Sequence, residues 1–580
     1  MGRNHVSYPN ACGIAVLDLN QGEDQAQGAK PWILAAPNLA VATREQVRAM
    51  IDMLVVDLSR WQFAATAMYH FIFVPLTLGL SFMMAIMESV YVMTGREVWR
   101  KATLFWGTLF GVNFAMGVAT GIVMEFQFGM NWSYYSHYVG DVFGAPLAIE
   151  GLMAFFLEAT FVGLFFFGWD RLSKVGHLIV TWLVAFGANF SALWILIANG
   201  WMQNPVGAKF NPDTMRMEIT DFMAVIFNSV AQAKFVHTVS AGYVCGAVFV
   251  LAISALFLVK GKHVELAKRS AVVAASFGLA SALSVVVLGD ESGYVATEHQ
   301  IMKIAALEAM YETEPAPASW TLIGLPGEDG QLGFHISIPW VGGLITTRSF
   351  DQELPGINEL VERAQVRIRS GMVAYDALEQ IRADGTNSQA REVFEEHWTD
   401  LGYGLLLKKY RDDVQNATDE EIAMAAADTV PDVWPLFWTF RIMMGLGFFF
   451  IAFFALWFYR ASRGWIDTNK PLLWVTVFLL PTPWIAIEAG WFIAEFGRQP
   501  WVVEGVLPTF YAASGLSVLD LVLSLTFFVV LYTVLLVIMI MLMVRIVKAG
   551  PKDKLFTPHD DDDFVIATLP ATPATKELGS

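Results

Sequence analysis

The sequence has few charged side chains and almost no cysteine. Only 16% of its 580 residues are charged, whereas soluble domains carry about 25%. The two cysteines, Cys12 and Cys245, are too few for a disulfide framework or a thiolate metal site. The net charge of −17 comes mainly from one long polar segment and the C-terminal tail. It therefore indicates a solvated surface and not a basic partner, and no nucleic-acid partner is expected.

Apolar residues make up 55% of the chain, and they occur in blocks. A block of roughly twenty apolar residues is long enough to cross a bilayer as a helix, and open strands cannot satisfy their backbone in lipid. The sequence therefore predicts an all-α integral membrane protein whose spans form a bundle. The nine predicted spans are residues 63–93, 103–128, 144–168, 176–201, 235–260, 270–289, 435–459, 472–496 and 516–546.

Basic residues predict the orientation of these spans. Lys and Arg follow each odd-numbered span, as Arg96, Arg100 and Lys101 follow the first, whereas the connection between the second and third spans has none. Basic connections stay in the cytoplasm. The N-terminus is therefore predicted on the outer, periplasmic side of a bacterial inner membrane, with the long polar segment between the sixth and seventh spans.

The chain is predicted to have five parts. The N-terminal extension contains no basic stretch followed by an apolar core, so it is not a signal peptide. We expect translation to start close to Met50, and we expect a disordered, cytoplasmic C-terminal tail. The parts are an extension at 1–49, spans one to six at 50–289, an outer loop at 290–432, spans seven to nine at 433–548, and the tail at 549–580.

Ionisable side chains within spans are costly in lipid, so each is a functional candidate. His70 and His237 lie well inside apolar blocks, each towards the predicted outer end of its helix. Helix-to-helix hydrogen bonds remain an alternative role for both.

Arg441 and Met443 open the seventh span. His and Met are axial ligands of haem iron, and a buried guanidinium suits a haem propionate. His237, Met443 and Arg441 therefore form a candidate haem site.

Further polar residues are predicted in the eighth and third spans. Glu488, Trp491, Glu495 and Arg498 fall within about 60° on one helical stripe, which suits a cofactor edge with Glu495 as a possible iron ligand. A structural ion-pair network is the alternative.

Glu150, near the predicted outer end of the third span, and the deeper Glu158 suit successive stops on a proton path. Ser191 and Asn189 on the fourth span are candidates to bridge that path through water. Hydrogen bonds to neighbouring helices are the alternative role for the two carboxylates.

Several long motifs resemble subunit I of cytochrome bd-type quinol oxidases with a long Q-loop. They are SRWQFAATAMYHFIFVPLTLG around His70, MEFQFGMNWSYYSHYVGDVFGAPLAIEGLMAFFLE through Glu150 and Glu158, AKFVHT with His237, GDESGY, FRIM, and EAGWFIAEFGRQPW. The resemblance covers roughly residues 50 to 550. The extension before Met50 has no counterpart in it.

The resemblance implies three haems, b558, b595 and d. His237 and Met443 match the axial ligands of haem b558, with Arg441 beside them. His70 and Glu495 match the ligands of the two high-spin haems, in an order left open, and Trp491 and Arg498 match residues packed around that pair.

The resemblance also implies an activity: quinol oxidised at the outer face, dioxygen reduced to water, and a proton motive force made without pumping. Glu150, Glu158 and Ser191 match proton-delivery groups, and Lys303 and Glu308 match Q-loop positions linked to quinol oxidation. The implied partners are subunit II and a small single-helix subunit. A haem-anchoring electron-transfer subunit and a secondary transporter are the alternatives.

Overall fold

The computed structural model describes residues 44–327 and 330–552. The chain divides into two compact units, Met1–Asp52 and Met53–Ser580, and the second unit contains the bundle of helices. Within the described residues, nine helical segments are long and apolar enough to cross a membrane, which confirms the predicted number. The expected disordered tail and most of the N-terminal extension lie outside the described residues.

Six of the nine spans consist largely of one long helix. The fifth span is the most enclosed, with 83% of its most apolar stretch buried, whereas the ninth has 17% and lies at the edge. The long helices are α3 (Glu97–Met130), α6 (Lys174–Gln203), α8 (Ser229–Val259, preceded by α7, Phe222–Ile226), α9 (Val264–His299), α16 (Val433–Ser462) and α20 (Val518–Ala549).

The first span is interrupted directly after His70. α1 (Arg44–His70) ends there, and α2 (Val74–Thr94) begins with Pro75 in its first turn, which has no N–H to continue a helix. Side chains of other helices bind carbonyl groups at the interruption: Trp484 Nε1 donates to Ile72 O at 2.8 Å, and Asn113 Nδ2 donates to Phe73 O at 2.8 Å. The break is therefore held by the tertiary structure.

The third span contains a wider helical turn at a predicted site residue. It comprises α4 (Ser133–Ile149), a π-helical turn (Glu150–Phe155) and α5 (Phe156–Phe167). Such turns are rare and occur often at functional sites. The placement of Glu150 near the outer end of its helix was wrong, because the helix begins eleven residues earlier than predicted and Glu150 lies near the middle of Ser133–Phe167.

The eighth span consists of two helices. α17 (Lys470–Phe478) and α18 (Thr482–Phe496) are separated by a turn next to Pro481 and Pro483. The prediction that Arg498 shares a helical stripe with Glu495 was wrong, because α18 ends at Phe496 and Arg498 lies in the turn that follows.

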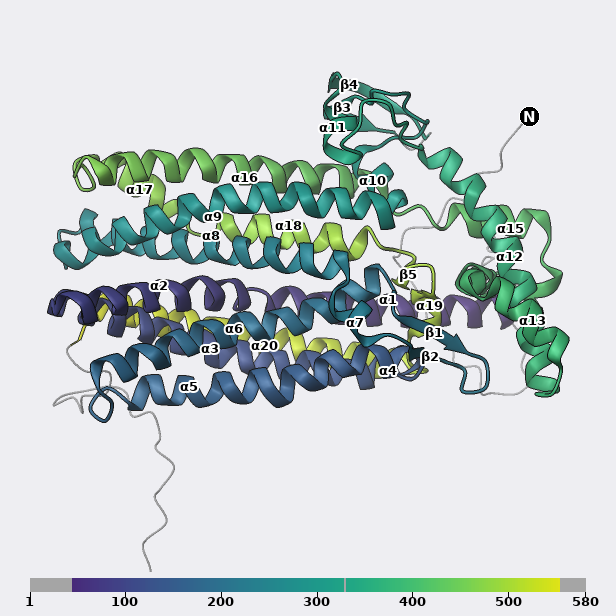
Figure 1. The fold of residues 1–580 in the computed structure, drawn as a ribbon, viewed down its shortest axis with the longest axis horizontal. Coiled ribbons are helices and arrows are strands. Elements are labelled where there is room, and N and C mark those ends of the chain that lie inside the picture. The colour runs from purple at the N-terminus through teal and green to yellow at the C-terminus, as the bar shows by residue number, and fades with distance from the viewer. Residues whose placement is uncertain (1–43, 328–329, 553–580) are drawn as a thin grey trace, which may run out of the picture. The chain divides into compact units, whose positions relative to one another are not determined.

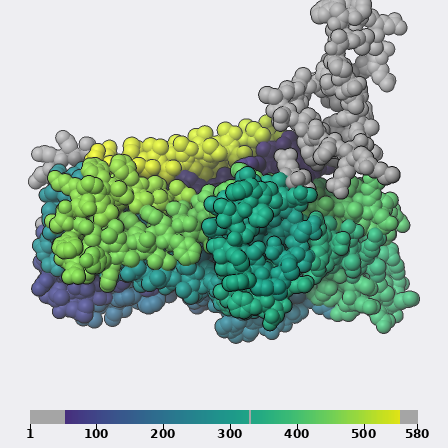
Figure 2. All heavy atoms as spheres, turned by 90° about the horizontal axis from the view of Figure 1, so that it is seen from above, coloured from purple at the N-terminus to yellow at the C-terminus, as the bar shows by residue number. Residues whose placement is uncertain are grey.

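The polar insert folds at one end of the bundle, which we call the insert end (Figure 1). In the space-filling view it forms a continuous body, teal to green, beside the seventh span (Figure 2). It contains the antiparallel hairpin of β3 (Trp320–Pro326) and β4 (Leu332–Ile338). Its helices are α10 (Ile301–Glu308), α11 (Val341–Thr346), α12 (Ile357–Ala383), α13 (Ser388–His397), α14 (Leu401–Leu405) and α15 (Asp419–Ala427).

Two smaller hairpins join spans at the insert end. β1 (Ala208–Asn211) pairs with β2 (Arg216–Ile219) between the fourth and fifth spans, and β5 (Trp501–Val503) pairs with β6 (Leu507–Pro508) after the eighth. A short helix, α19 (Thr509–Ala512), follows β6. The chain segments that follow α6 and α18 therefore form hairpins at the insert end.

Candidate functional site

His70 is fixed by a hydrogen bond that leaves one ring nitrogen available. Its Nδ1 lies 2.9 Å from Thr120 Oγ1, which itself donates to Met116 O at 2.9 Å and therefore accepts from the ring. The Nδ1–H tautomer leaves a lone pair on Nε2, which has no partner among the described residues. Metal-binding histidines are oriented in this way. A Cβ on Gly121 would lie 3.2 Å from His70 Cε1, so a larger residue at this position would crowd the ring.

His237 on α8 has the same arrangement. Its Nδ1 lies 3.0 Å from Val285 O of α9, and a carbonyl only accepts. Nε2 again has a lone pair and no partner in the described part of the chain. A Cβ on Gly289 would lie 3.0 Å from the His237 ring, so α9 approaches closely because of this glycine. His70 and His237 therefore each leave Nε2 available to a ligand.

Arg441 has a protein anion as its partner. We expected a haem propionate, but Arg441 Nη2 lies 2.8 Å from Glu308 Oε2 of α10, and its other hydrogen bonds go to carbonyl groups, including Thr321 O at 2.5 Å. Its Nε is buried without a partner. Met443, two residues along α16, has its Sδ against Gly490 of α18. The seventh span thus links the insert with the interior of the bundle.

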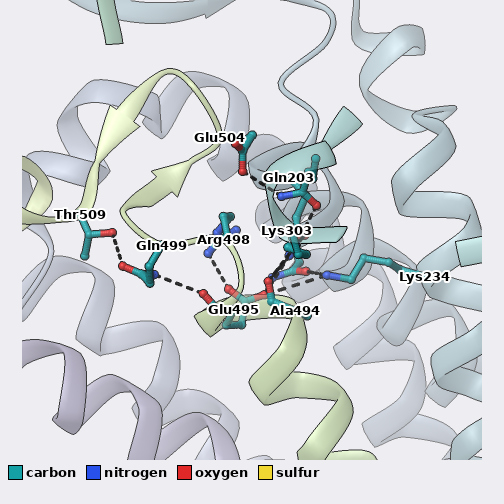
Figure 3. Close-up of polar contacts among 11 residues, drawn as sticks. Gln203, Lys234, Lys303, Ala494, Glu495, Arg498, Gln499, Glu504 and Thr509 are labelled. Atoms are coloured by element: carbon teal, nitrogen blue, oxygen red, sulfur yellow. Dashed lines mark hydrogen bonds and ion pairs between the residues drawn. The ribbon is translucent and has the colours of Figure 1, made fainter. Parts of the chain in front are cut away.

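Glu495 lies at the centre of a charged cluster at the insert end of α18 (Figure 3). Its carboxylate accepts from Arg498 Nη2 at 2.5 Å, from Asn199 Nδ2 at 3.0 Å and from Gln203 Nε2 at 3.2 Å. Lys234 Nζ lies 4.0 Å away. Arg498 is 4% exposed, yet its Nε and Nη1 have no partner among the residues that the structure describes. The cluster therefore has unsatisfied donors for a further anion.

Trp491 and Glu488 lie on the same stripe of α18, nearer the bundle centre. The Trp491 ring packs edge-on against Phe71, the residue after His70, at 4.9 Å between centroids. Both carboxyl oxygens of Glu488 are buried and lack a partner among the described residues. His70 and the Glu495 stripe therefore border one region of the bundle.

Lys303 and Glu308 share α10 but contact different groups. Lys303 Nζ donates to Gln203 Oε1 at 2.7 Å and to Gln300 Oε1 at 2.8 Å, on the side of the Glu495 cluster (Figure 3). Burial and the nearby Lys234 charge lower the pKa of Lys303 to about 7. Glu308 contacts Arg441 and the indole of Trp320. α10 thus connects the Arg441 side with the Glu495 side.

A polar cavity of about 400 Å³ adjoins this cluster at the insert end. Arg498 and Glu504 line it from the segment after the eighth span, and Lys303, Arg367 and Tyr403 line it from the insert. Gln300 Nε2 donates to Glu504 Oε2 at 2.9 Å, and burial raises the pKa of the Glu504 carboxyl. A hydrogen-bonded chain therefore runs from Glu495 through Gln203, Lys303 and Gln300 to the cavity wall.

Of the residues expected on the proton path, Ser191 contacts Glu150 and Asn189 does not. Ser191 Oγ donates directly to Glu150 Oε1 at 2.6 Å, so no water is needed between them. The Cα of Glu158 lies 3.5 Å from the position of a Cβ on Gly187 of α6. Asn189 does not join this pair, since its side chain bonds Ala185 O and Tyr243 Oη.

Sequence reasoning missed two features. Lys234 and Asn199 join the Glu495 cluster. The only signal for this in the sequence was that Lys234 belongs to the motif AKFVHT. His177, near the start of α6, is 2% exposed, with Nδ1 2.6 Å from Glu88 Oε1 and Nε2 2.9 Å from Phe165 O. Glu88 lies within the first predicted span, and an intramembrane carboxylate was the available signal.

The donor atoms fit haem groups. In the described part of the chain, no three His, Cys, Asp or Glu residues gather as a metal cluster. Single side chains such as His70, His237 and Met443 instead suit a group that supplies its own equatorial ligands. The orphaned guanidinium nitrogens of Arg441 and Arg498 suit carboxylates such as propionates.

The comparisons with known proteins agree. A family model described as cytochrome bd terminal oxidase subunit I matches residues 58–551. The chain is 51% identical over 472 residues to cytochrome bd-II ubiquinol oxidase subunit 1 of Escherichia coli (strain K12), covering 81% of this chain and 92% of that protein. It is 37% identical over 460 residues to cytochrome bd ubiquinol oxidase subunit 1 of Bacillus subtilis (strain 168), covering 79% and 86%.

A solved structure shows the same fold. The bd oxidase from Geobacillus thermodenitrificans superposes with a TM-score of 0.69 at 23% identity, covering 86% of this chain and 99% of that chain. Motifs, donor geometry and fold all agree with the family model, whose match spans nearly the whole membrane part. The chain therefore belongs to the cytochrome bd terminal oxidase subunit I family.

Proposed function

We propose that this chain is the haem-bearing subunit of a bacterial terminal quinol oxidase that transfers electrons from quinol to dioxygen. The observation that carries the proposal is the matched geometry of His70 and His237, each with Nδ1 held by an acceptor and Nε2 free. Family membership supports the activity, since the relatives are named ubiquinol oxidases. A simple electron-transfer anchor leaves His70 and Glu495 unexplained, and a secondary transporter does not account for ligand-type residues such as His70 and Met443.

We assign three haems to this chain. His237 and Met443 would hold haem b558, and His70 and Glu495 would hold haems b595 and d in either order. These groups supply electron transfer and the binding of dioxygen. The protein orients the ligand atoms: Thr120 and Val285 O fix the histidine tautomers, and Arg498 and Asn199 hold the Glu495 carboxylate.

Quinol oxidation is placed at the insert end, next to α10. Burial raises the pKa of the Glu308 carboxyl even though Arg441 opposes that shift, so Glu308 is suited to accept a proton from a quinol hydroxyl. Arg441 pairs with Glu308 and lies two residues from Met443. Glu308, the proposed proton acceptor, is therefore held by its ion pair to α16, the same helix that carries Met443. Lys303 lies five residues away, facing the Glu495 cluster.

Protons for water formation come from the opposite face in this proposal. Two quinols supply four electrons and release four protons outside, and one dioxygen takes four protons from the cytoplasm to give two waters. Glu158 and then Glu150 carry these protons, with Ser191 holding Glu150 by its 2.6 Å hydrogen bond. Charge separation across the membrane follows without a pump. The insert end is then the periplasmic face, as the basic residues between spans predict.

The proposed assembly contains at least one partner subunit. The family relation supports subunit II, and a small single-helix subunit is the finer proposal. Many apolar side chains of α20, such as Leu523, Phe527 and Val530, are exposed in the isolated chain. Such surfaces face lipid or a second membrane subunit.

A reduced-minus-oxidised visible spectrum of the purified complex tests the proposal. We expect b-type bands together with a far-red haem d band, and quinol-dependent oxygen consumption in the same preparation. A spectrum with b-type bands alone would support an electron-transfer anchor. A spectrum without haem bands would contradict the proposal entirely.

A further inference from the structure

Lys234 is the only Lys, Arg, Asp or Glu of α8, and it lies three residues before His237. Three residues on a helix correspond to about 4.5 Å of rise and about 60° of rotation, so both side chains leave one face of α8. A charged side chain inside a membrane bundle is costly and needs partners. The partners of Lys234 therefore indicate what it does.

The hydrogen bond, ion pair and ring contact of the Lys234 ammonium all lie on the Glu495 side (Figure 3), while its charge also interacts with His237 without direct contact. Nζ donates to Asn199 Oδ1 at 2.5 Å, and Asn199 Nδ2 donates to Glu495 Oε1 at 3.0 Å. Nζ also lies 4.0 Å from Glu495 Oε1 and 5.5 Å from the centroid of the Trp491 ring. One ammonium thus contacts the expected iron-ligand carboxylate, directly and through an amide, and the ring face of the neighbouring indole.

Trp491 extends this contact towards His70. Its ring packs against Phe71 at 4.9 Å, directly after His70 and at the break between α1 and α2. The Lys234 side chain therefore starts on the side of α8 that carries His237, and its ammonium reaches the region bordered by Glu495, Trp491 and His70. Its side chain is only 13% exposed, so water screens its charge weakly.

We propose that Lys234 is a positioning residue that sets the distribution of electrons between the His237 site and the Glu495 site. A fixed positive charge stabilises an electron that arrives nearby, and the effect decreases with distance. The contacts place the charge against Glu495, so the Glu495 site gains more than the His237 site. The ammonium also withdraws charge from the carboxylate and makes it a weaker donor to iron, which raises the potential further.

This inference rests on the proposed function, because it concerns electrons that arrive from quinol. The transfer itself is a one-electron step from the reduced His237 site to the oxidised Glu495 site, and no bond to Lys234 forms or breaks. Lys234 stays an ammonium throughout. Its contribution is therefore a shift of equilibrium and not a chemical step.

Spectroelectrochemical titration of the purified complex tests the inference. In Lys234→Met we expect the equilibrium between the two sites to move about tenfold towards the His237 site, which is 59 mV for a one-electron couple. Lys234→Gln keeps a hydrogen-bond donor for Asn199 but lacks the charge, and it should behave like Lys234→Met. Lys234→Arg keeps the charge and should restore most of the wild-type separation.

Lys174→Met is the matched control. Lys174 Nζ also lies over an aromatic ring, 5.1 Å from Tyr91, but at the other end of α6 from Gln203. Its loss should leave the separation of potentials unchanged. If the bands are intact and the separation in Lys234→Met and Lys234→Gln equals that of wild type, the inference is wrong. An equal shift in Lys234→Arg would also overturn it. A wild-type complex without high-spin haem would instead refute the proposed function, and this inference with it.

Discussion

Arg441 and Glu308 form a buried ion pair, with Nη2 2.8 Å from Oε2, that connects the seventh span to α10. Their side chains are 9% and 11% exposed. Breaking a buried pair by removing one partner is strongly destabilising, because a charge remains uncompensated. The pair therefore holds the expected quinol-oxidising segment next to the helix that carries Met443.

The first prediction concerns Glu308 as a proton acceptor. Glu308→Gln keeps a hydrogen-bond acceptor for Arg441 but cannot take a proton, so quinol-driven reduction of the haems should slow by about 100-fold or more. Stopped-flow spectroscopy with quinol measures this rate. Chemical reduction with dithionite should still give the wild-type spectrum. Glu353→Gln, at an exposed position of the same insert, is the control. Quinol-driven reduction at the wild-type rate in Glu308→Gln would contradict the assignment.

The second prediction concerns Glu150. Glu150→Gln should lower oxygen consumption by about 100-fold, because a relay carboxyl is lost, while the reduction of haem b558 by quinol stays intact. Ser191→Ala should have a smaller effect, because it removes only the 2.6 Å hydrogen bond to Glu150. Ser276→Ala, an exposed hydroxyl on α9, is the control. Unchanged turnover in Glu150→Gln would refute the proton relay.

The third prediction concerns pH and Lys303. The pKa of Lys303 in the folded chain is about 7, below the ordinary 10.5, because burial disfavours the ammonium. Between these values the unfolded chain binds the additional proton, so this group makes the fold more stable as pH rises. We expect the melting temperature of wild type, relative to Lys303→Met, to increase between pH 6 and pH 9. A difference independent of pH would show that Lys303 does not titrate in this range.

The fourth prediction concerns the buried Glu88 and His177 pair. Glu88 Oε1 lies 2.6 Å from His177 Nδ1, and Glu88 Oε2 accepts from Thr181 Oγ1 at 2.5 Å. His177→Ala should destabilise the fold by about 3 kcal/mol, because it leaves the buried Glu88 carboxyl without a hydrogen-bond partner at one oxygen. Thr181→Val should cost only about 1 kcal/mol. Thermal unfolding measures both. The haem spectrum of the folded variants should stay unchanged, and an altered spectrum would point to a direct role.

The fifth prediction concerns the orientation of His70. Thr120→Val removes the acceptor for His70 Nδ1 with almost no change in shape. Loss of such an outer partner weakens metal binding by about 10- to 100-fold, so the variant should lose high-spin haem while haem b558 remains. Thr103→Val on the same helix is the control, since Thr103 Oγ1 bonds only the Trp99 carbonyl. A full complement of all haems at limiting haem supply would contradict the role of Thr120.

The sequence by itself determined the class of fold and the candidate ligands. Hydrophobic blocks long enough to span a bilayer predict the number of spans, because lipid leaves helices as the available solution for such segments. The same cost of polar groups in lipid identified His70, His237, Glu150, Glu158 and Glu495. Each is a local property of composition, so it can be read without knowing which helices are neighbours.

The tertiary structure decided what these residues contact. The break after His70 depends on Trp484, which is 412 residues away in the sequence from Ile72. The partner of Arg441 is Glu308. Lys303 faces the Glu495 cluster and not Arg441, because Lys303 and Glu308 leave α10 in different directions. Arg498 lies beyond the end of its helix. Pairings of this kind are set by which helices pack together, and periodicity along one segment contains no information about its neighbours.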